Sequence, residues 1–125
     1  MELDPVPIRH VRWMGDARER LQDFPAPVRK DIGHALYLVQ SGQTPPCAKP
    51  MRGIEPGVYE IVDDFDTDTY RAVYTVKLGS SLYVLHAFMK KSKRGIATPK
   101  REIDLIKARL RRAKEMAQAE AHNHG

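Results

Sequence analysis

Cysteine is almost absent from this sequence, and long apolar runs are missing altogether. Cys47 is the single cysteine, so no disulfide can form within the chain, which fits a reducing compartment. No apolar stretch approaches the ~20 residues that span a bilayer, and the N-terminus has no signal-peptide pattern. We therefore expect a soluble, cytoplasmic protein. Its 125 residues predict one domain, residues 1–125, with an ordered core at about 8–118.

Standard catalytic signatures are missing too. The sequence has no glycine-rich dinucleotide motif, no P-loop, no H-E-x-x-H motif and no G-x-S-x-G motif. His122 and His124 lie two residues apart near the C-terminus, but a structural zinc site needs four ligands. Cys47 has no neighbouring base that would activate it as a nucleophile. The sequence therefore predicts neither a bound metal nor an organic cofactor.

Positive charge is concentrated in one part of the chain. The whole sequence has a net charge of +5, but residues 90–114 hold eleven Lys and Arg against only Glu102 and Asp104, a net charge of +9. The remainder of the chain is therefore at −4. Such a basic zone is typical of a surface that binds a polyanion. A solvated helix face rich in Lys and Arg would give the same pattern.

Two helices are predicted in the first third of the chain, after a short strand at residues 8–14. Asp16 precedes Glu19 by three residues, which is the spacing of a capping box at a helix start. Pro25 and Pro27 interrupt the helical pattern. Pro27 suits the first turn of a second helix, which we expect to end near Gly42.

The rest of the chain predicts a three-stranded sheet and a final helix. We expect the strands at residues 58–62, 70–78 and 82–89, the last of them buried on both faces because it is almost wholly apolar. Residues 63–68 and the pair Gly79-Ser80 predict the hairpin connections, and the proline-rich residues 42–57 predict a long irregular loop. Thr98-Pro99 predicts the start of the helix, with residues 122–125 frayed. This order predicts an α+β fold, with helices packed on a small antiparallel sheet.

Charged and aromatic side chains are expected to meet on one patch of this sheet. Antiparallel pairing would bring together residues from the loop before the first strand, from two strands, and from the end of the third strand: Lys49, Arg52, Glu60, Arg71 and Phe88-Met89-Lys90-Lys91. The aromatic members would be Tyr59, Tyr83 and Phe88. Cations that bind phosphates and rings that stack on bases suit RNA. Each residue taken singly is better explained as an ordinary surface charge or core ring, and only the cluster as a whole favours RNA binding.

Several short motifs resemble those of a known family when they are taken in order. They are Lys49-Pro-Met-Arg-Gly-Ile-Glu-Pro-Gly-Val-Tyr-Glu-Ile, Tyr70-Arg71-Ala-Val-Tyr74, Leu85-His-Ala-Phe88-Met-Lys90-Lys91 and Thr98-Pro99. Over about residues 8–118 the chain resembles the phage-derived, HigB-like branch of the RelE/ParE toxin superfamily. It departs from the family pattern in its proline-rich loop around Cys47 and in its very basic final helix.

The resemblance implies a fold, an activity and a partner. The fold would be two N-terminal helices on a small antiparallel sheet with a C-terminal helix. The activity would be ribosome-dependent cleavage of messenger RNA as part of a type II toxin–antitoxin system. The partner would be a cognate antitoxin, an acidic protein with a helix-turn-helix domain. Carried over by position, the catalytic residues are Glu60, Arg71, Lys90 and Lys91, and the RNA-binding residues are Lys49, Arg52, Tyr59, His86, Phe88 and Arg94.

The implied chemistry is attack of the RNA 2′-hydroxyl on the neighbouring phosphate, without a metal. Glu60 would be the base, Arg71 the phosphate stabiliser through its planar fork, and Lys90 or Lys91 a second stabiliser or the acid. Because Arg71 would be an exposed strand residue, we expect Arg71→Ala to fold normally. Two alternatives remain open at this point: a ParE-type gyrase poison, and a nucleic-acid-binding module without enzymatic activity.

Overall fold

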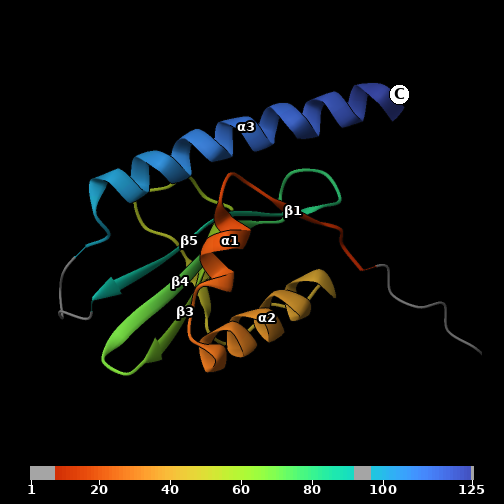
Figure 1. Ribbon diagram of the computed structural model, residues 1–125. Coiled ribbons are helices and arrows are strands. Elements are labelled where there is room, and N and C mark those ends of the chain that lie inside the picture. The colour runs from red at the N-terminus through yellow and green to blue at the C-terminus, as the bar shows by residue number, and fades with distance from the viewer. Residues whose placement is uncertain (1–7, 92–96, 125) are drawn as a thin grey trace, which may run out of the picture.

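The structure, a computed structural model, describes residues 8–91 and 97–124 and has the predicted α+β fold (Figure 1). A five-stranded sheet has the order β1-β5-β4-β3-β2. The neighbouring pairs are antiparallel except for β1 with β5, which are parallel, so the sheet is mixed rather than wholly antiparallel. In chain order the elements are β1 Val11–Trp13, α1 Ala17–Gln22, α2 Ala26–Gln40, β2 Ala48–Pro50, β3 Val58–Phe65, β4 Asp68–Thr75, β5 Leu82–Lys91 and α3 Lys100–His124. No helix within these described ranges has the length and apolar character needed to cross a membrane.

The two N-terminal helices form as predicted, but the capping box does not. Asp16 is the N-cap of α1, yet its side chain makes no cap hydrogen bond. Its oxygens bind Arg20 at 2.8 Å and Arg109 at 2.6 Å instead, because a guanidinium is a stronger partner for a carboxylate than a backbone amide. Pro27 lies in the first turn of α2, where its missing N–H costs nothing.

The loops around the sheet differ from the predictions in three places. β3 continues to Phe65, and its hairpin with β4 turns at Asp66 and Thr67, which both have positive φ, 49° and 71°. β4 ends at Thr75, whose hydroxyl donates to Gly57 O at 2.7 Å, so a six-residue connection replaces the predicted two-residue turn. The proline-rich segment is not wholly irregular, because β2 within it pairs with β3.

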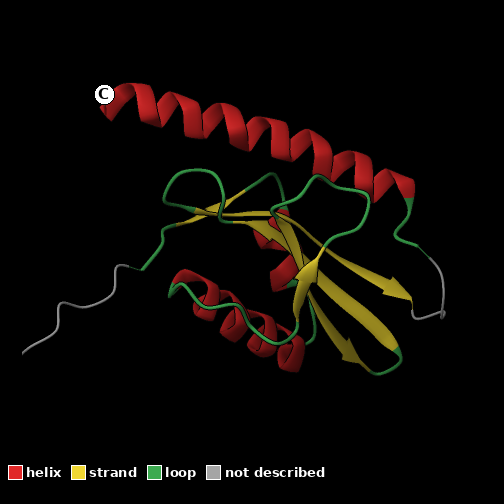
Figure 2. Ribbon diagram, turned by 180° about the vertical axis from the view of Figure 1, so that it is seen from behind, coloured by secondary structure: helices red, strands yellow, loops and turns green. Residues whose placement is uncertain are grey.

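Both faces of the sheet are covered (Figures 1 and 2). Helices α1 and α2 pack on one face, against Ile61, Ala72 and Tyr74 among others. On the opposite face, α3 packs through Ile106, Leu110 and Ala113 onto β3, β4 and β5. Residues 82–88 of β5 are consequently buried on both faces, as predicted. α3 runs through the residues expected to fray and ends at His124.

Candidate functional site

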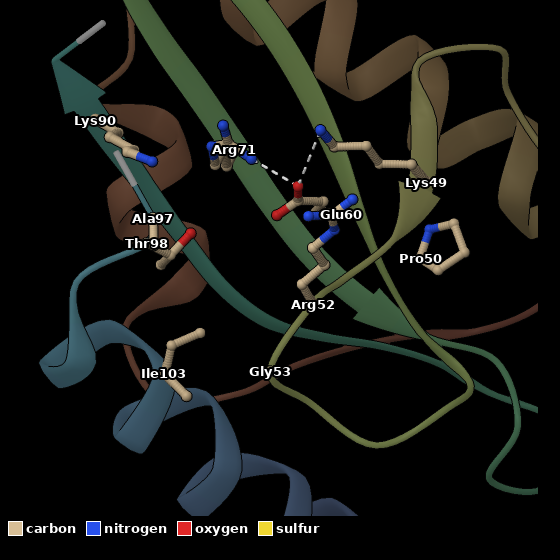
Figure 3. Close-up of a pocket in the computed structure, with 10 residues that line it drawn as sticks. All are labelled: Lys49, Pro50, Arg52, Gly53, Glu60, Arg71, Lys90, Ala97, Thr98 and Ile103. Carbon is tan, nitrogen blue, oxygen red and sulfur yellow. Dashed lines mark hydrogen bonds and ion pairs between the residues drawn. The ribbon is translucent and has the colours of Figure 1, made fainter. Parts of the chain in front are cut away.

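A cavity of about 700 Å³ opens on the α3 side of the sheet. Four strands, the loop after β2, the segment before α3 and the first turn of α3 all contribute to its walls (Figure 3). The lining residues are Lys49, Pro50, Arg52, Gly53, Glu60, Arg71, Lys90, Ala97, Thr98 and Ile103. Five residues that the sequence predicted for a shared patch, namely Lys49, Arg52, Glu60, Arg71 and Lys90, are therefore brought together here.

Strand register explains why the charged side chains converge. Lys49 is the direct partner of Glu60, and Glu60 is the partner of Val73, two residues from Arg71. Residues two apart on a strand point to the same face, and directly opposed residues share a face. The Arg71 Nη1 donates to Glu60 Oε1 at 2.6 Å, and Lys49 Nζ lies 3.6 Å from the same oxygen (Figure 3).

The Glu60–Arg71 pair lies largely out of solvent. The side chains of Glu60 and Arg71 are 7% and 14% exposed, whereas that of Lys49 is 60% exposed. The expectation that Arg71 is an exposed strand residue is therefore wrong: it does face away from Tyr74, as alternation requires, but β3 and β5 flank its strand and Glu60 pairs with it. Arg71 Nε is buried and has no hydrogen-bond partner among the described residues. A buried donor without a partner costs about 1–3 kcal/mol.

Lys90 completes the cationic wall of the cavity. It is the partner of Thr69 at the end of β5, on the same face of the sheet as Arg71. Partial burial and the nearby Arg71 and Lys49 cations lower the pKa of Lys90, while the Glu60 carboxylate opposes this shift. An ammonium with a lowered pKa releases its proton more readily than a free lysine does.

Two residues predicted for the patch lie on the other face of the sheet. Tyr59 stacks on Tyr74, with ring centroids 5.8 Å apart, in the core beneath α2. Lys91 is the partner of Asp68, and it is exposed and does not line the cavity. Side chains alternate along a strand, so the neighbours of Glu60 and Lys90 had to point away from them. Placing Tyr59 and Lys91 in the patch was therefore wrong.

The remaining predicted aromatic residues belong to the core. Tyr83 and His86 have no exposed surface, and Phe88 is 4% exposed. Phe88 stacks on His86, with ring centroids 5.1 Å apart. None of the three reaches the cavity, so the expectation that these rings lie open to stack on bases is wrong. Arg94, also predicted to bind RNA, lies outside the described residues.

His86 belongs to a buried polar network that the sequence did not reveal. Its Nδ1 lies 3.1 Å from Arg109 Nη1, and its Nε2 bonds Glu102. Because a guanidinium only donates, Nδ1 accepts, and the ring is the neutral Nε2–H tautomer that donates to Glu102. Burial lowers the pKa of His86, as do the nearby Arg109 and Arg20 cations, despite the opposing effect of Glu102.

Arg109 extends the network to the start of α1. It donates to Leu85 O at 3.0 Å and to Asp16 Oδ1 at 2.6 Å. Hydrogen bonds from Arg20 and Arg109 lower the pKa of Asp16 to about 2. The network thus ties α3 to β5 and α1 and holds the first turn of α3, which carries Ile103, against the cavity.

No group of three or more His, Cys, Asp or Glu is placed to hold a metal ion within residues 8–91 and 97–124. Cys47 is exposed on the loop before β2. Although the residue as a whole is exposed, partial desolvation of the thiol raises its pKa, and the charges of Asp63 and Asp31 add to this shift, which keeps the group protonated and a poor nucleophile.

The chain was compared with families, curated proteins and solved structures. No curated protein matches it. A chain in the crystal structure of the toxin–antitoxin complex RelBE2 from Mycobacterium tuberculosis has 19% sequence identity and a TM-score of 0.47, with 66% of this chain and 99% of that chain covered. The family described as "Phage derived protein Gp49-like (DUF891)" matches residues 19–111, a range that contains every residue lining the cavity. This match confirms the recognition of the phage-derived branch from the sequence motifs: the chain belongs to the phage-derived Gp49-like family.

Proposed function

We propose that this protein is the toxin of a type II toxin–antitoxin system and that it cleaves messenger RNA on the ribosome. The observation that carries the proposal is the Arg71 side chain, which lines the cavity and, among the described residues, makes hydrogen bonds only through Nη1, to Glu60. A guanidinium with unused donors binds phosphate oxygens well, because its planar fork matches their spacing. The neighbouring Lys49, Arg52 and Lys90 make the cavity suitable for a polyanion.

Glu60 is the proposed base for the attacking 2′-hydroxyl. Arg71 and Lys49 both contact Oε1, and no hydrogen bond to Oε2 is found among the described residues. That second oxygen is therefore available to accept the hydroxyl proton. The hydroxyl oxygen then bonds to phosphorus, and the P–O bond to the next ribose breaks, which leaves a 2′,3′-cyclic phosphate.

Arg71 and Lys90 have complementary proposed roles. Arg71 stabilises the charge that develops on the phosphate oxygens. Lys90, with its lowered pKa, gives a proton to the departing 5′-oxygen. Lys49 and Arg52 lie at the open side of the cavity and bind the flanking phosphates. Lys91, Tyr59, His86 and Phe88 lie elsewhere and have no part in these steps.

The proposed partner is an antitoxin that is acidic and carries a helix-turn-helix domain. Residues 90–114 carry a net charge of +9, and an uncovered polycation would engage RNA without selection. Copurification of this protein with a tightly bound acidic protein would support this assignment. A complex that leaves the cavity open would show that inhibition follows another route.

The experiment is induction in a bacterium, followed by primer extension on messenger RNA. Three variants make it specific to the cavity: Arg71→Lys, Lys90→Gln and Lys91→Gln. Arg71→Lys keeps the positive charge beside Glu60 but loses the fork, and we expect cleavage to fall by about two orders of magnitude. Lys90→Gln is expected to lose activity, whereas Lys91→Gln, its neighbour on the opposite face, should remain toxic.

The outcomes separate the proposal from its alternatives. Growth arrest with intact messenger RNA and broken DNA would identify a gyrase poison instead. Absence of toxicity together with RNA binding would identify a binding module. Equal loss of activity in Lys90→Gln and Lys91→Gln would show that general surface charge, and not this cavity, is responsible.

A further inference from the structure

A second, smaller groove continues from the cavity along α3. It has a volume of about 350 Å³ and is lined by Gly53, Ile54, Glu55, Lys107, Leu110 and Arg111. Gly53 lines both the cavity and the groove. Because Gly53 has no side chain, only backbone stands between the two at that point. Ile103, on the cavity wall, lies one helical turn before Lys107, so the same stripe of α3 forms both walls.

The two cations of the groove differ from the rest of the basic helix. Five of the seven Lys and Arg of α3 are in ion pairs: Lys100 with Asp104, Arg101 with Glu102, Arg109 with Asp16, Arg112 with Glu115 and Lys114 with Glu55. Lys107 and Arg111 form no ion pair with any residue in the described ranges, and both are exposed. Most of the basic charge of α3 is thus neutralised, and what remains faces the groove.

The groove also has an apolar floor and a neutralised carboxylate. Leu110 is buried, and Ile54 is half-buried. Glu55 accepts hydrogen bonds from Lys114 at 2.7 and 2.8 Å, so its charge is offset within the groove wall. Lys107 and Arg111 are four residues apart, which places them roughly 6 Å apart along the helix axis. Two cations in line above an apolar floor suit a chain of alternating phosphate and sugar.

We propose that this groove is a second subsite that binds the phosphodiester backbone of RNA beyond the cleavage cavity. The inference rests on the proposed function, and it adds the path of the strand: from Arg71, past Gly53, to Lys107 and Arg111. The same backbone chemistry is present in the message and in the ribosomal RNA next to it. The experiment below distinguishes these two sources.

The test compares two double variants with equal charge change on one helix. Lys107→Gln/Arg111→Gln removes the groove cations, and Lys100→Gln/Arg112→Gln removes two cations that are already paired. All four side chains are exposed, so both proteins are expected to fold. Binding is measured against salt with two probes: a single-stranded, uncleavable 2′-O-methyl RNA, and ribosomes without message. A dinucleotide of the same chemistry tests the cavity alone.

We expect the groove variant to bind the long probe at least about tenfold more weakly, with a salt slope smaller by about 1.4, the value for two phosphates of a single strand. Its dinucleotide binding should be unchanged, and the control variant should behave like the wild type. An effect with free RNA assigns the groove to the message, and an effect only with ribosomes assigns it to ribosomal RNA.

If the salt slope of Lys107→Gln/Arg111→Gln equals that of the wild type with both probes, the proposal of an RNA subsite in the groove is wrong. If Arg71→Lys still impairs cleavage in that case, the proposed function stands without it. A wild-type protein that associates with neither RNA nor ribosomes overturns the groove and the proposed function together.

Discussion

Removal of the Arg71 guanidinium is expected to destabilise the fold as well as the active site. Glu60 is 5% exposed and would keep Lys49, 3.6 Å away and itself largely exposed, and the nearby charge of Lys90 as counter-ions. Loss of one partner of a fully buried pair costs about 3–5 kcal/mol. Because Lys49 remains and the cavity is open to water, we expect Arg71→Gln to cost about 2–4 kcal/mol. For a domain of this size that corresponds to a fall in Tm of roughly 8–16 °C.

A double-mutant cycle isolates the pair from the individual side chains. Glu60→Gln/Arg71→Gln removes both charges, so we expect the double variant to be less destabilised than the two single losses added together, by about 1–3 kcal/mol. Urea unfolding at neutral pH gives the free energy of unfolding of the wild type, the two single variants and the double variant. Lys49→Gln is the control and is expected to cost under about 1 kcal/mol. Additive single losses, or an Arg71→Gln protein as stable as the wild type, would refute the argument that this pair is desolvated and coupled.

Three further predictions concern residues away from the cavity. Gly15→Ala should be strongly destabilising, because φ is +52° and the new Cβ would lie 2.6 Å from the Arg109 guanidinium; a higher Tm than the wild type would contradict the observed backbone. Burial lowers the pKa of His86, so the stability that the neutral ring contributes is present above the unfolded-state pKa of about 6.5 and is lost as pH falls below it. His86→Gln should therefore weaken the dependence of the free energy of unfolding on pH in that range. Burial and the nearby Asp31 raise the pKa of Asp63 to about 6, so protonation of Asp63 increases the stability of the fold as pH falls from about 6 towards 4. Asp31→Asn should raise the Tm at pH 7. An unchanged Tm would show that the two carboxylates do not interact.

The sequence by itself determined most elements of the fold and the charged half of the cavity wall. Apolar patterning located β3, β4 and β5, by alternation in β4 and by an apolar run in β5, and proline and threonine located the starts of α2 and α3. These are local signals, because the side-chain period of a strand and the caps of a helix depend on neighbouring residues only. The same alternation, applied strictly, would have excluded Tyr59 and Lys91, since each adjoins a residue that faces the cavity.

Only the tertiary structure decided which charged residues are partners. Asp16 and Arg109 are 93 positions apart, and their contact exists because α1 and α3 both reach the edge of β5. His86 resembled an RNA contact in the linear pattern, yet the packing of α3 buries it and gives it Glu102 and Arg109 as partners. Arg71, similarly, is largely shielded from solvent because β4 is an inner strand of the sheet and Glu60 of β3 pairs with it. Burial and pairing of charges depend on elements that are distant in sequence, and no local pattern encodes that distance.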